Sequence, residues 1–408
     1  MKLHGGEPFW PLQSGLVGVY PPLVQDEACD VLVVGAGITG ALVASSFAQR
    51  GHRVIVIDRR DVASGSTSAS TSLLQYEIDV PLTELRTTLG REPAGLAYRI
   101  GVDAIHSLFT AAASIDLPIS RGRSLYVAGS PEDQDFMHTE AAARKEEGLD
   151  ARHVRGDELR SRWNINAAAG IESSLCASMD PYLFTHGLLK LVCTAGGKVF
   201  DRTAVLRLTP DATGVTALTE RGPHIRSRWA VLACGYETRE FIPENIVSLH
   251  STYALVTEPL LGGLPWPQGT LFWEHGPAYL YARQTLDGRF MIGGEDEPFK
   301  NAQLRDLLLA DKTRAILDKF ERFIPGLKLE PAFSWAGTFG RTEDGLGYIG
   351  PPVGHDRLLC ALGFGGNGIT FSAVAADLLP KLVEARERGR DLAGKDRDVA
   401  ALFAFGRS

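Results

Sequence analysis

The sequence predicts an α/β protein built around a parallel strand–helix–strand unit near its N-terminus. The apolar run Val31–Val34 leads into the glycine-rich turn Gly35–Gly40, whose sequence is GAGITG. A second apolar run, Val54–Ile57, follows a helical stretch and ends on Asp58. A buried strand, a tight glycine turn, a helix and a second strand closed by an acid are the fingerprint of a Rossmann-like dinucleotide site.

Length and composition bound the class of protein. The chain has 408 residues, enough for more than one domain and for a sizeable core, and its net charge of −7 argues against a nucleic-acid-binding protein. No stretch approaches the ~18 uninterrupted apolar residues of a membrane span, and the N-terminus has no signal-peptide pattern. The five cysteines are odd in number and show no paired spacing, so we expect no disulfide framework, no metal site and a cytoplasmic location.

Each glycine of the turn has its own role. Gly35 permits the tight turn, Gly37 lets a phosphate approach the backbone, and Gly40 lets the helix at about 38–50 pack close to the strand. The N–H groups and the positive dipole end of that helix suit a pyrophosphate. Asp58 is placed to accept hydrogen bonds from ribose hydroxyls. The turn alone does not decide between NAD and FAD.

Two further segments bear on that choice. Segment 63–72, with the sequence ASGSTSASTS, is either a flexible polar linker or a second cradle for the phosphates and ribityl chain of the cofactor. The glycine-rich stretch Gly363–Gly368 precedes an amphipathic helix. It either caps that helix or points N–H groups at the flavin pyrimidine carbonyl. A nicotinamide fold does not need this second loop, so the loop favours FAD.

The motifs resemble those of the D-amino-acid-oxidase-type FAD oxidoreductases, a family that includes glycine and sarcosine oxidases. The resemblance keeps the order of the motifs over nearly the whole chain. It is carried by GAGITG, IDRR and GSTSASTS, by Trp229–Gly235 and Trp335–Gly337, by Thr342–Gly345 running on to Gly350, and by Leu362–Ile369. The motifs are specific to the family and not to a substrate.

The resemblance implies an α/β fold, α+β overall, in which a Rossmann-like FAD-binding domain carries a discontinuous antiparallel-sheet substrate domain. In this family the chain leaves the FAD domain twice to build a sheet over the flavin. The FAD-binding domain is expected at residues 1–80, 168–240 and 335–408, with one strand over residues 198–206, and its residues 1–28 form an extended arm that packs aromatic side chains on the body. The substrate domain is expected at residues 81–167 and 241–334, with a helical stretch at 82–113 and strands at 124–127, 252–257, 278–283 and 289–292.

The resemblance and the fingerprint together give a set of expected FAD-binding residues. They come from the first turn, the end of the second strand, the hydroxyl-rich segment, two later strands and the C-terminal loop. The set is Gly35, Ala36, Gly37, Ile38, Thr39, Gly40, Asp58, Arg59, Arg60, Ser66, Thr67, Ser68, Ser70, Thr71, Leu73, Leu74, Val205, Ala233, Gly235, Gly363, Gly365, Gly366, Asn367, Gly368, Ile369 and Thr370.

Four positions depart from the family pattern. Glycine oxidase-like members clamp the substrate carboxylate with two arginines, at positions that are Phe339 and Gly366 here. Sarcosine oxidase-like members attach FAD to a cysteine and face the flavin with a lysine, at positions that are Gly337 and Met291 here. Phe339 and Gly366 cannot pair with a carboxylate, which puts glycine or sarcosine as the substrate in doubt. Gly337 predicts noncovalent FAD.

Six residues are candidates for the substrate pocket: Gln75, Tyr253, Tyr279, Tyr281, Arg283 and Arg341. Alternation puts Tyr279, Tyr281 and Arg283 on one face of a strand, which either covers the flavin or faces solvent. Arg341 lies two residues from the position of the first missing arginine. It is either a displaced cation for a carboxylate or part of a surface ion pair. Gln75 follows the hydroxyl-rich segment and is placed to bond the flavin edge.

The sequence therefore predicts an FAD-dependent amine or amino-acid oxidase or dehydrogenase that removes a hydride from a carbon bonded to nitrogen. The alternatives are an FAD-dependent 2-hydroxy-acid oxidase or dehydrogenase, a flavin-binding subunit active only in a complex, and an NAD-dependent dehydrogenase. The expected partners are a small amine or amino-acid substrate and an electron acceptor, O2 or another. No general base stands out in the sequence, and an oligomer is compatible with it.

Overall fold

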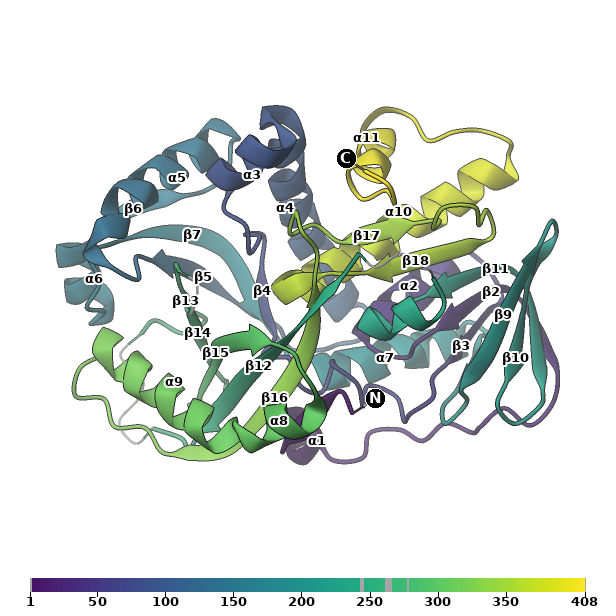
Figure 1. Cartoon of the computed structure of the whole chain (residues 1–408), viewed down its shortest axis with the longest axis horizontal. Coiled ribbons are helices and arrows are strands. Elements are labelled where there is room, and N and C mark those ends of the chain that lie inside the picture. The colour runs from purple at the N-terminus through teal and green to yellow at the C-terminus, as the bar shows by residue number, and fades with distance from the viewer. Residues whose placement is uncertain (1, 243–245, 261–265, 277–278, 408) are drawn as a thin grey trace.

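The computed structural model describes residues 2–242, 246–260, 266–276 and 279–407, which form two large sheets with helices packed on them (Figure 1). In Figure 1 the sheet with the N-terminal strand–helix–strand unit lies on the right and the other sheet on the left. The predicted α/β class is confirmed. None of the described helices has both the length and the apolar character needed to cross a bilayer.

The eight-stranded sheet has the order β17-β18-β11-β2-β3-β8, and β10 and β9 extend it beside β11. Neighbours from β18 to β8 are parallel, whereas β17, β10 and β9 pair antiparallel. Its central strands are apolar on both faces because both faces are covered. Its strands are β2 (Glu27–Val34), β3 (Val54–Ile57), β8 (Lys198–Phe200), β9 (Val205–Asp211), β10 (Gly214–Thr219), β11 (His224–Leu232), β17 (Tyr348–Gly350) and β18 (Leu358–Leu362).

A layer of helices covers one face of this sheet. The fingerprint helix α2 (Ile38–Gln49) packs between α7 (Pro181–Thr194) and α10 (Gly368–Glu387), and α10 packs on α4 (Arg91–Ala113). The C-terminal helix α11 (Gly394–Leu402) packs on α4 and α10. Their apolar side chains join those of β2 and β3 in the largest core cluster. The N-terminus of α2 is thereby held rigidly at the end of β2.

The second sheet is mainly antiparallel and has the order β1-β16-β12-β15-β14-β13-β5-β7-β4, with β6 beside β7. The pair β5–β13 is parallel, which departs from the fully antiparallel sheet expected. The strands are β1 (His4–Gly6), β4 (Leu73–Gln75), β5 (Ser120–Val127), β6 (Arg152–Arg155), β7 (Ala169–Ser178), β12 (Ser248–Thr257), β13 (Leu271–Glu274), β14 (Leu280–Gln284), β15 (Phe290–Pro298) and β16 (Pro331–Arg341). β1, β4 and β7 come from segments assigned to the FAD-binding domain, and the domain boundaries stay a prediction.

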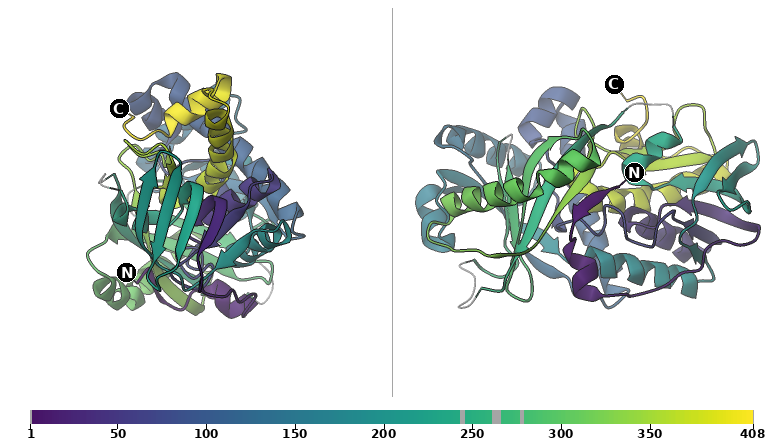
Figure 2. Two further views of the ribbon diagram at one scale, coloured as in Figure 1. Left: turned by 90° about the vertical axis from the view of Figure 1, so that its right-hand side faces the viewer. Right: turned by 60° about the horizontal axis from the view of Figure 1, so that its bottom comes forward.

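Helices also cover the second sheet. The amphipathic helix α9 (Leu309–Phe323) packs on β12, β14, β15 and β16, and α8 (Ala302–Leu307) precedes it. At the other end of the sheet, α5 (Gln134–Glu146) contacts α3 (Leu82–Leu89) as well as β6 and β7, and α6 (Gly156–Trp163) lies on β6 and β7. Figure 2 shows α9 running along this sheet, away from the eight-stranded one.

Three predicted elements differ in detail. The helical stretch 82–113 is two helices, because Gly90 takes a left-handed conformation with φ of 86° between α3 and α4. The strand expected near 198–206 is split into β8 and β9. The N-terminal arm is not extended throughout, since it forms β1 against β16 and the helix α1 (Phe9–Ser14). Phe9 and Trp10 are buried as expected. Position 278, the expected start of one strand, lies outside the described residues, and β14 begins at Leu280.

Candidate functional site

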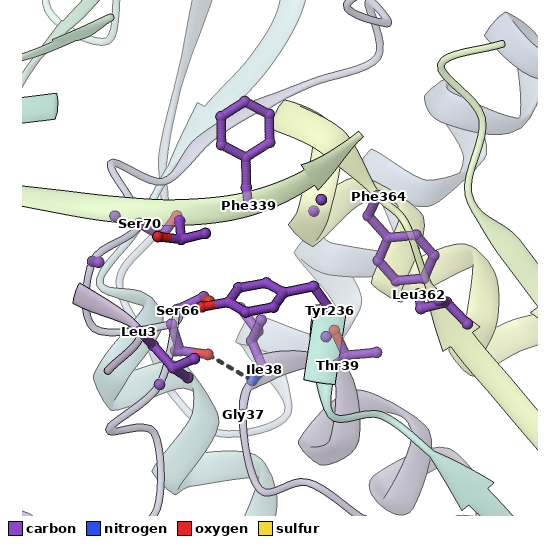
Figure 3. Close-up of a pocket in the computed structure, with 18 of the residues that line it drawn as sticks. Leu3, Gly37, Ile38, Thr39, Ser66, Ser70, Tyr236, Phe339, Leu362 and Phe364 are labelled. Atoms are coloured by element: carbon purple, nitrogen blue, oxygen red, sulfur yellow. Dashed lines mark hydrogen bonds between the residues drawn. The ribbon is translucent and has the colours of Figure 1, made fainter. Parts of the chain in front are cut away.

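One large cavity lies where the two sheets meet (Figure 3). Its walls come from the turn after β2, the hydroxyl-rich segment, the short 3-10 helix η2 (Gly235–Glu240), the strands β12, β14 and β16, and the C-terminal loop. Segments far apart in the sequence thus share one site. In Figure 3 the ring of Tyr236 reaches across the cavity toward Ser66, and Phe339 lies above it on β16.

The fingerprint turn is held by a dense set of hydrogen bonds. The Asp58 carboxylate accepts from the backbone N–H of Ala36 at 2.7 Å and from that of Arg60 at 2.8 Å. Burial raises the pKa of this carboxyl group, against the lowering effect of both N–H groups. A side chain at Gly40 would place its Cβ 1.8 Å from the Gly35 carbonyl oxygen. The close packing of α2 on the turn therefore requires glycine at this position.

The hydroxyl-rich segment forms one wall of the cavity and is tied to the body by hydrogen bonds. Three consecutive carbonyl groups accept hydrogen bonds: that of Ala69 from the Trp335 indole at 2.8 Å, that of Ser70 from the Trp10 indole at 2.6 Å, and that of Thr71 from Arg283 at 2.6 Å. Earlier in the segment, the Thr67 hydroxyl accepts a hydrogen bond from the Ile38 N–H at 3.0 Å. The segment is thus tied to the N-terminus of α2, as a second wall of the site requires.

Paired charges fix the end of the cavity beside Asp58. The Arg60 guanidinium makes two hydrogen bonds of 2.8 Å to the buried Glu237 carboxylate, and Arg59 pairs with Glu240 at 2.8 Å. Such a bidentate pair holds η2 against the end of β3 with a defined orientation. Both arginines line the cavity, and both are engaged by acids of η2.

The C-terminal loop is fastened to the segment that follows β4. The Asn367 side chain donates to the Glu77 carbonyl at 2.6 Å and accepts from the Asp79 N–H at 3.0 Å. The Gly366 N–H donates to the Asp79 carboxylate at 2.8 Å. Thr370 in the first turn of α10 donates to the Gln75 carbonyl at 2.9 Å. This clasp holds the N-terminus of α10 at the cavity wall.

Most of the expected FAD-binding residues line this cavity. Those that do are Gly35, Gly37, Ile38, Thr39, Asp58, Arg59, Arg60, Ser66, Thr67, Ser70, Thr71, Leu73, Val205, Ala233, Gly235, Gly363, Gly365, Gly366, Asn367, Gly368 and Ile369. Ala36, Gly40, Ser68, Leu74 and Thr370 do not line it. They lie behind the wall, where Ala36 bonds Asp58, Gly40 packs against Gly35 and Thr370 bonds Gln75.

The candidates for the substrate pocket divide in the same way. Gln75, Tyr279 and Tyr281 line the cavity. Arg283 shares the strand face of the tyrosines but lies farther along β14, buried under the hydroxyl-rich segment, where burial lowers its pKa to about 10. Tyr253 points to the opposite face of β12, into the core beneath α9. Arg341 is exposed at the end of β16 and does not line the cavity.

Several lining residues were not expected from the sequence. Thr252 lines the cavity in place of its neighbour Tyr253, and Trp273 of β13, Tyr236 of η2 and Leu3 of the arm contribute side chains. Asp79 contributes a carboxylate next to the C-terminal loop. The alternation along β12 carried the signal for Thr252, but both faces of that strand are largely buried, so the sequence did not show which face meets the cavity.

Fold and site together define a Rossmann-type dinucleotide-binding protein with a second, sheet-forming region closing the cavity. Comparison with known families then narrows the class. Residues 30–382 match the family model described as FAD dependent oxidoreductase, and the chain belongs to this family. It is accordingly an FAD-dependent oxidoreductase, which confirms the predicted family, class and cofactor.

Individual relatives are distant. The chain is 24% identical over 372 residues to a glycine oxidase of Geobacillus kaustophilus (strain HTA426), covering 89% of this chain and 95% of the relative. It is 26% identical over 389 residues to the putative Rieske 2Fe-2S iron-sulfur protein YhfW of Bacillus subtilis (strain 168), covering 93% of this chain and 73% of that protein. The crystal structure of the Geobacillus kaustophilus glycine oxidase superposes with a TM-score of 0.78 at 19% identity, over 94% of this chain and 99% of the other.

The cavity residues fit FAD. Gly37 offers bare backbone at the turn where a pyrophosphate must approach, and the N-terminus of α2 supplies N–H groups there. Two buried polar atoms in the cavity wall have no partner among the described residues, the Gln75 side-chain oxygen and the Tyr236 hydroxyl. Buried polar groups without partners are rare in folded proteins, and a bound cofactor with polar edges would supply those partners.

Proposed function

We propose that this protein oxidises a carbon–nitrogen single bond of an amine or amino acid. When bound, FAD supplies the acceptor for a hydride from the carbon next to nitrogen. The substrate nitrogen gives up a proton, and water converts the resulting C=N bond to a carbonyl group and a free amine. The glycine oxidase relatives, which by name oxidise an amino acid, support this class of reaction.

The chain's own residues have three tasks in this proposal. Gly35, Gly37 and the N-terminus of α2 bind the pyrophosphate, and Asp58 binds the ribose. The clasp between Asp79 and the C-terminal loop would hold N–H groups toward a bound flavin, where they would stabilise negative charge on its ring. Gly337 lines the cavity and has no side chain to attach a flavin, which supports noncovalent binding.

One observation favours nitrogen over oxygen in the substrate. Among the described residues that line the cavity there is no histidine and no lysine, and the basic side chains are Arg59 and Arg60, both paired at the Asp58 end. A 2-hydroxy acid needs a cation for its carboxylate and a base for its hydroxyl proton. An amine that reacts as the neutral base needs neither.

An anaerobic titration of the purified, FAD-loaded protein tests the proposal. Amines, amino acids and 2-hydroxy acids are added in turn, and the visible flavin absorbance and the products are followed. The proposal expects bleaching by a nitrogen compound, with a carbonyl product and ammonia or amine in equal amounts. Bleaching by a 2-hydroxy acid alone, with a keto acid as the only product, would overturn it.

We also propose a cytoplasmic location. Cys29, Cys176, Cys193 and Cys234 form no disulfide within the described residues, and Cys29 and Cys176 are buried. Free buried thiols suit a reducing compartment.

Whether O2 or another acceptor takes the electrons is decided by re-exposing the bleached protein to air. Rapid return of the flavin colour with release of hydrogen peroxide identifies an oxidase.

A further inference from the structure

The β14 end of the cavity combines aromatic rings with acidic groups. Tyr279, Tyr281, Trp273 and Asp79 all line it. The Tyr279 hydroxyl donates to the carboxylate of Asp296 on β15 at 2.9 Å. The two tyrosine rings lie 6.0 Å apart between centroids. Aromatic faces and carboxylates both attract a cation, and neither holds a carboxylate ligand.

Asp79 lies beside Gly366, the position at which glycine oxidase-like members of the family are expected to carry a carboxylate-binding arginine. A Cβ at Gly366 would lie 2.7 Å from one Asp79 carboxylate oxygen and 2.9 Å from the other. A larger residue at 366, arginine included, is therefore excluded while Asp79 keeps this place. The same carboxylate accepts the Gly366 N–H at 2.8 Å, which fixes its position at the cavity wall. The loop clasp thus also presents a fixed negative charge to the cavity.

A second observation points to a ligand with N–H donors. Gln75 is only 9% exposed and lines the cavity, and its side-chain oxygen has no partner among the described residues. Asp296 does not line the cavity and acts on it through Tyr279, from whose hydroxyl group it accepts a hydrogen bond. The Gln75 oxygen, which also counts toward the fit to FAD, is satisfied by whichever bound molecule, cofactor or substrate, donates an N–H group to it.

The charge at this end of the cavity is negative. Burial raises the pKa of the Asp79 carboxyl group and that of Asp296, the latter to about 6, against a lowering effect of Arg341, which is exposed and does not line the cavity. The guanidinium group of Arg341 is thus set against two carboxyl groups, those of Asp79 and Asp296, and the Asp79 group forms part of the cavity wall.

A smaller cavity continues past Asp79. It shares Asp79, Trp273 and Tyr279 with the main cavity and adds the side chains of Glu84, Glu274, Tyr126 and His275. Glu274 is neutralised by Lys319 at 2.8 Å, whereas Glu84 is exposed. The lining therefore continues past Asp79 with the exposed carboxylate of Glu84, which gives room for a molecule longer than glycine.

We infer that the substrate is an amine with a second cationic nitrogen, such as an aliphatic diamine, and without a carboxylate next to the reacting carbon. Asp79 and the rings of Tyr279 and Tyr281 hold the charged nitrogen, while the other nitrogen reacts as the neutral base. This inference rests on the proposed function and names the substrate class of the same site. It also accounts for the replacement of both carboxylate-binding arginines by Phe339 and Gly366.

Three four-carbon compounds test it on the FAD-loaded protein: 1,4-diaminobutane, 1-aminobutane and 4-aminobutanoate. They share a chain and one amine, and differ in the charge of the far end. We expect kcat/KM for the diamine to exceed that for the monoamine roughly tenfold to hundredfold, the range that one charged hydrogen bond supplies, with 4-aminobutanoate lowest. Faster turnover of 4-aminobutanoate, glycine or sarcosine than of the diamine would overturn the inference and leave the proposed function standing.

Asp79→Asn removes the charge and keeps an acceptor for the Gly366 N–H. Because only the diamine uses the charge, the ratio of kcat/KM for 1,4-diaminobutane to that for 1-aminobutane should fall to about one, whatever change both substrates share through the loop clasp. An equal loss for both amines would show a purely structural role and contradict the inference. The matched control is Asp311→Asn on α9, where the acid has 78% side-chain exposure. It should change kcat/KM for neither the diamine nor 1-aminobutane. If Asp79→Asn does not retain FAD, Asp296→Asn takes its place. We then expect a several-fold loss of kcat/KM for the diamine relative to 1-aminobutane.

A binding measurement separates this inference from the proposed function. Tetramethylammonium cannot be oxidised at a neutral nitrogen, so its titration against the flavin spectrum reports recognition alone. We expect it to perturb the spectrum saturably and acetate not to, with the response weakened by Asp79→Asn. A response to acetate and none to tetramethylammonium would overturn the cationic site. Absence of bleaching by every amine and amino acid, beside a normal tetramethylammonium response, would contradict only the proposed function.

Discussion

The fit of α2 against the fingerprint turn gives the sharpest structural prediction. Replacing Gly40 by alanine introduces a Cβ that would lie 1.8 Å from the Gly35 carbonyl oxygen, a contact that must open to at least 3.0 Å. Backbone meets backbone here, so no flexible side chain can yield. The helix must move away from the turn, and the N–H groups that face the cavity move with it.

The magnitude follows from two effects. Overpacking of this kind costs about 1–3 kcal/mol of folding free energy. Misplacing two N–H groups that we propose to bind the pyrophosphate should lose about 3 kcal/mol of FAD affinity or more, which is over a hundredfold. Gly40→Ala should therefore fold with a lowered midpoint of unfolding and be purified largely without FAD.

Gly51→Ala at the far end of α2 is the matched control. Gly51 has φ of 86° and a Cβ there meets nothing within 4 Å, so alanine adds left-handed strain of about 1–2 kcal/mol without a clash. The assay is the flavin-to-protein absorbance ratio, with a fluorescence titration of FAD into each apoprotein. Both variants should be destabilised, and Gly40→Ala alone should lose FAD. Equal FAD affinity in the two variants would refute the argument.

Three further predictions concern the walls of the cavity. Arg283→Met should leave the Thr71 carbonyl without its donor, lowering unfolding free energy by about 1–3 kcal/mol in denaturant titrations and speeding FAD release. Glu237→Gln should weaken the bidentate pair with Arg60 and raise the dissociation constant of FAD several-fold, whereas Glu343→Gln, at an exposed site, should not. Diamine affinity should fall as the pH drops through about 6, because burial raises the pKa of Asp296 to about 6 and its charge is lost below that value. The groups that face Asp296 include Thr252, Tyr279, Tyr281, Asp79 and Arg341; a pH-independent dissociation constant between pH values of about 5 and 8 would contradict this role.

The parts of the site made from local sequence could be predicted well. The turn GAGITG, Asp58 and the loop at 363–369 carry their geometry in consecutive residues, and the structure gathers them in one cavity. Their glycines and the acid have few alternative explanations once the flanking apolar runs are present.

Residues contributed by the second sheet were harder to predict. β12 is largely buried on both faces, so its alternation did not distinguish Thr252 from Tyr253. Asp79 looks like an isolated acid in the sequence YEID, and its role depends on a contact with Gly366, which is 287 residues away. Arg283 shares a strand face with two cavity residues but meets the hydroxyl-rich segment instead. Such long-range contacts leave no local pattern.

The most direct test of the central claim is a single anaerobic turnover with an amine deuterated at the carbon next to nitrogen. Our account predicts that one equivalent of the amine bleaches the flavin, that one equivalent of carbonyl product appears, and that deuterium slows the bleaching several-fold. Bleaching without a carbonyl product, or an intact flavin spectrum with every amine and amino acid, would contradict oxidation of a carbon–nitrogen bond at this site.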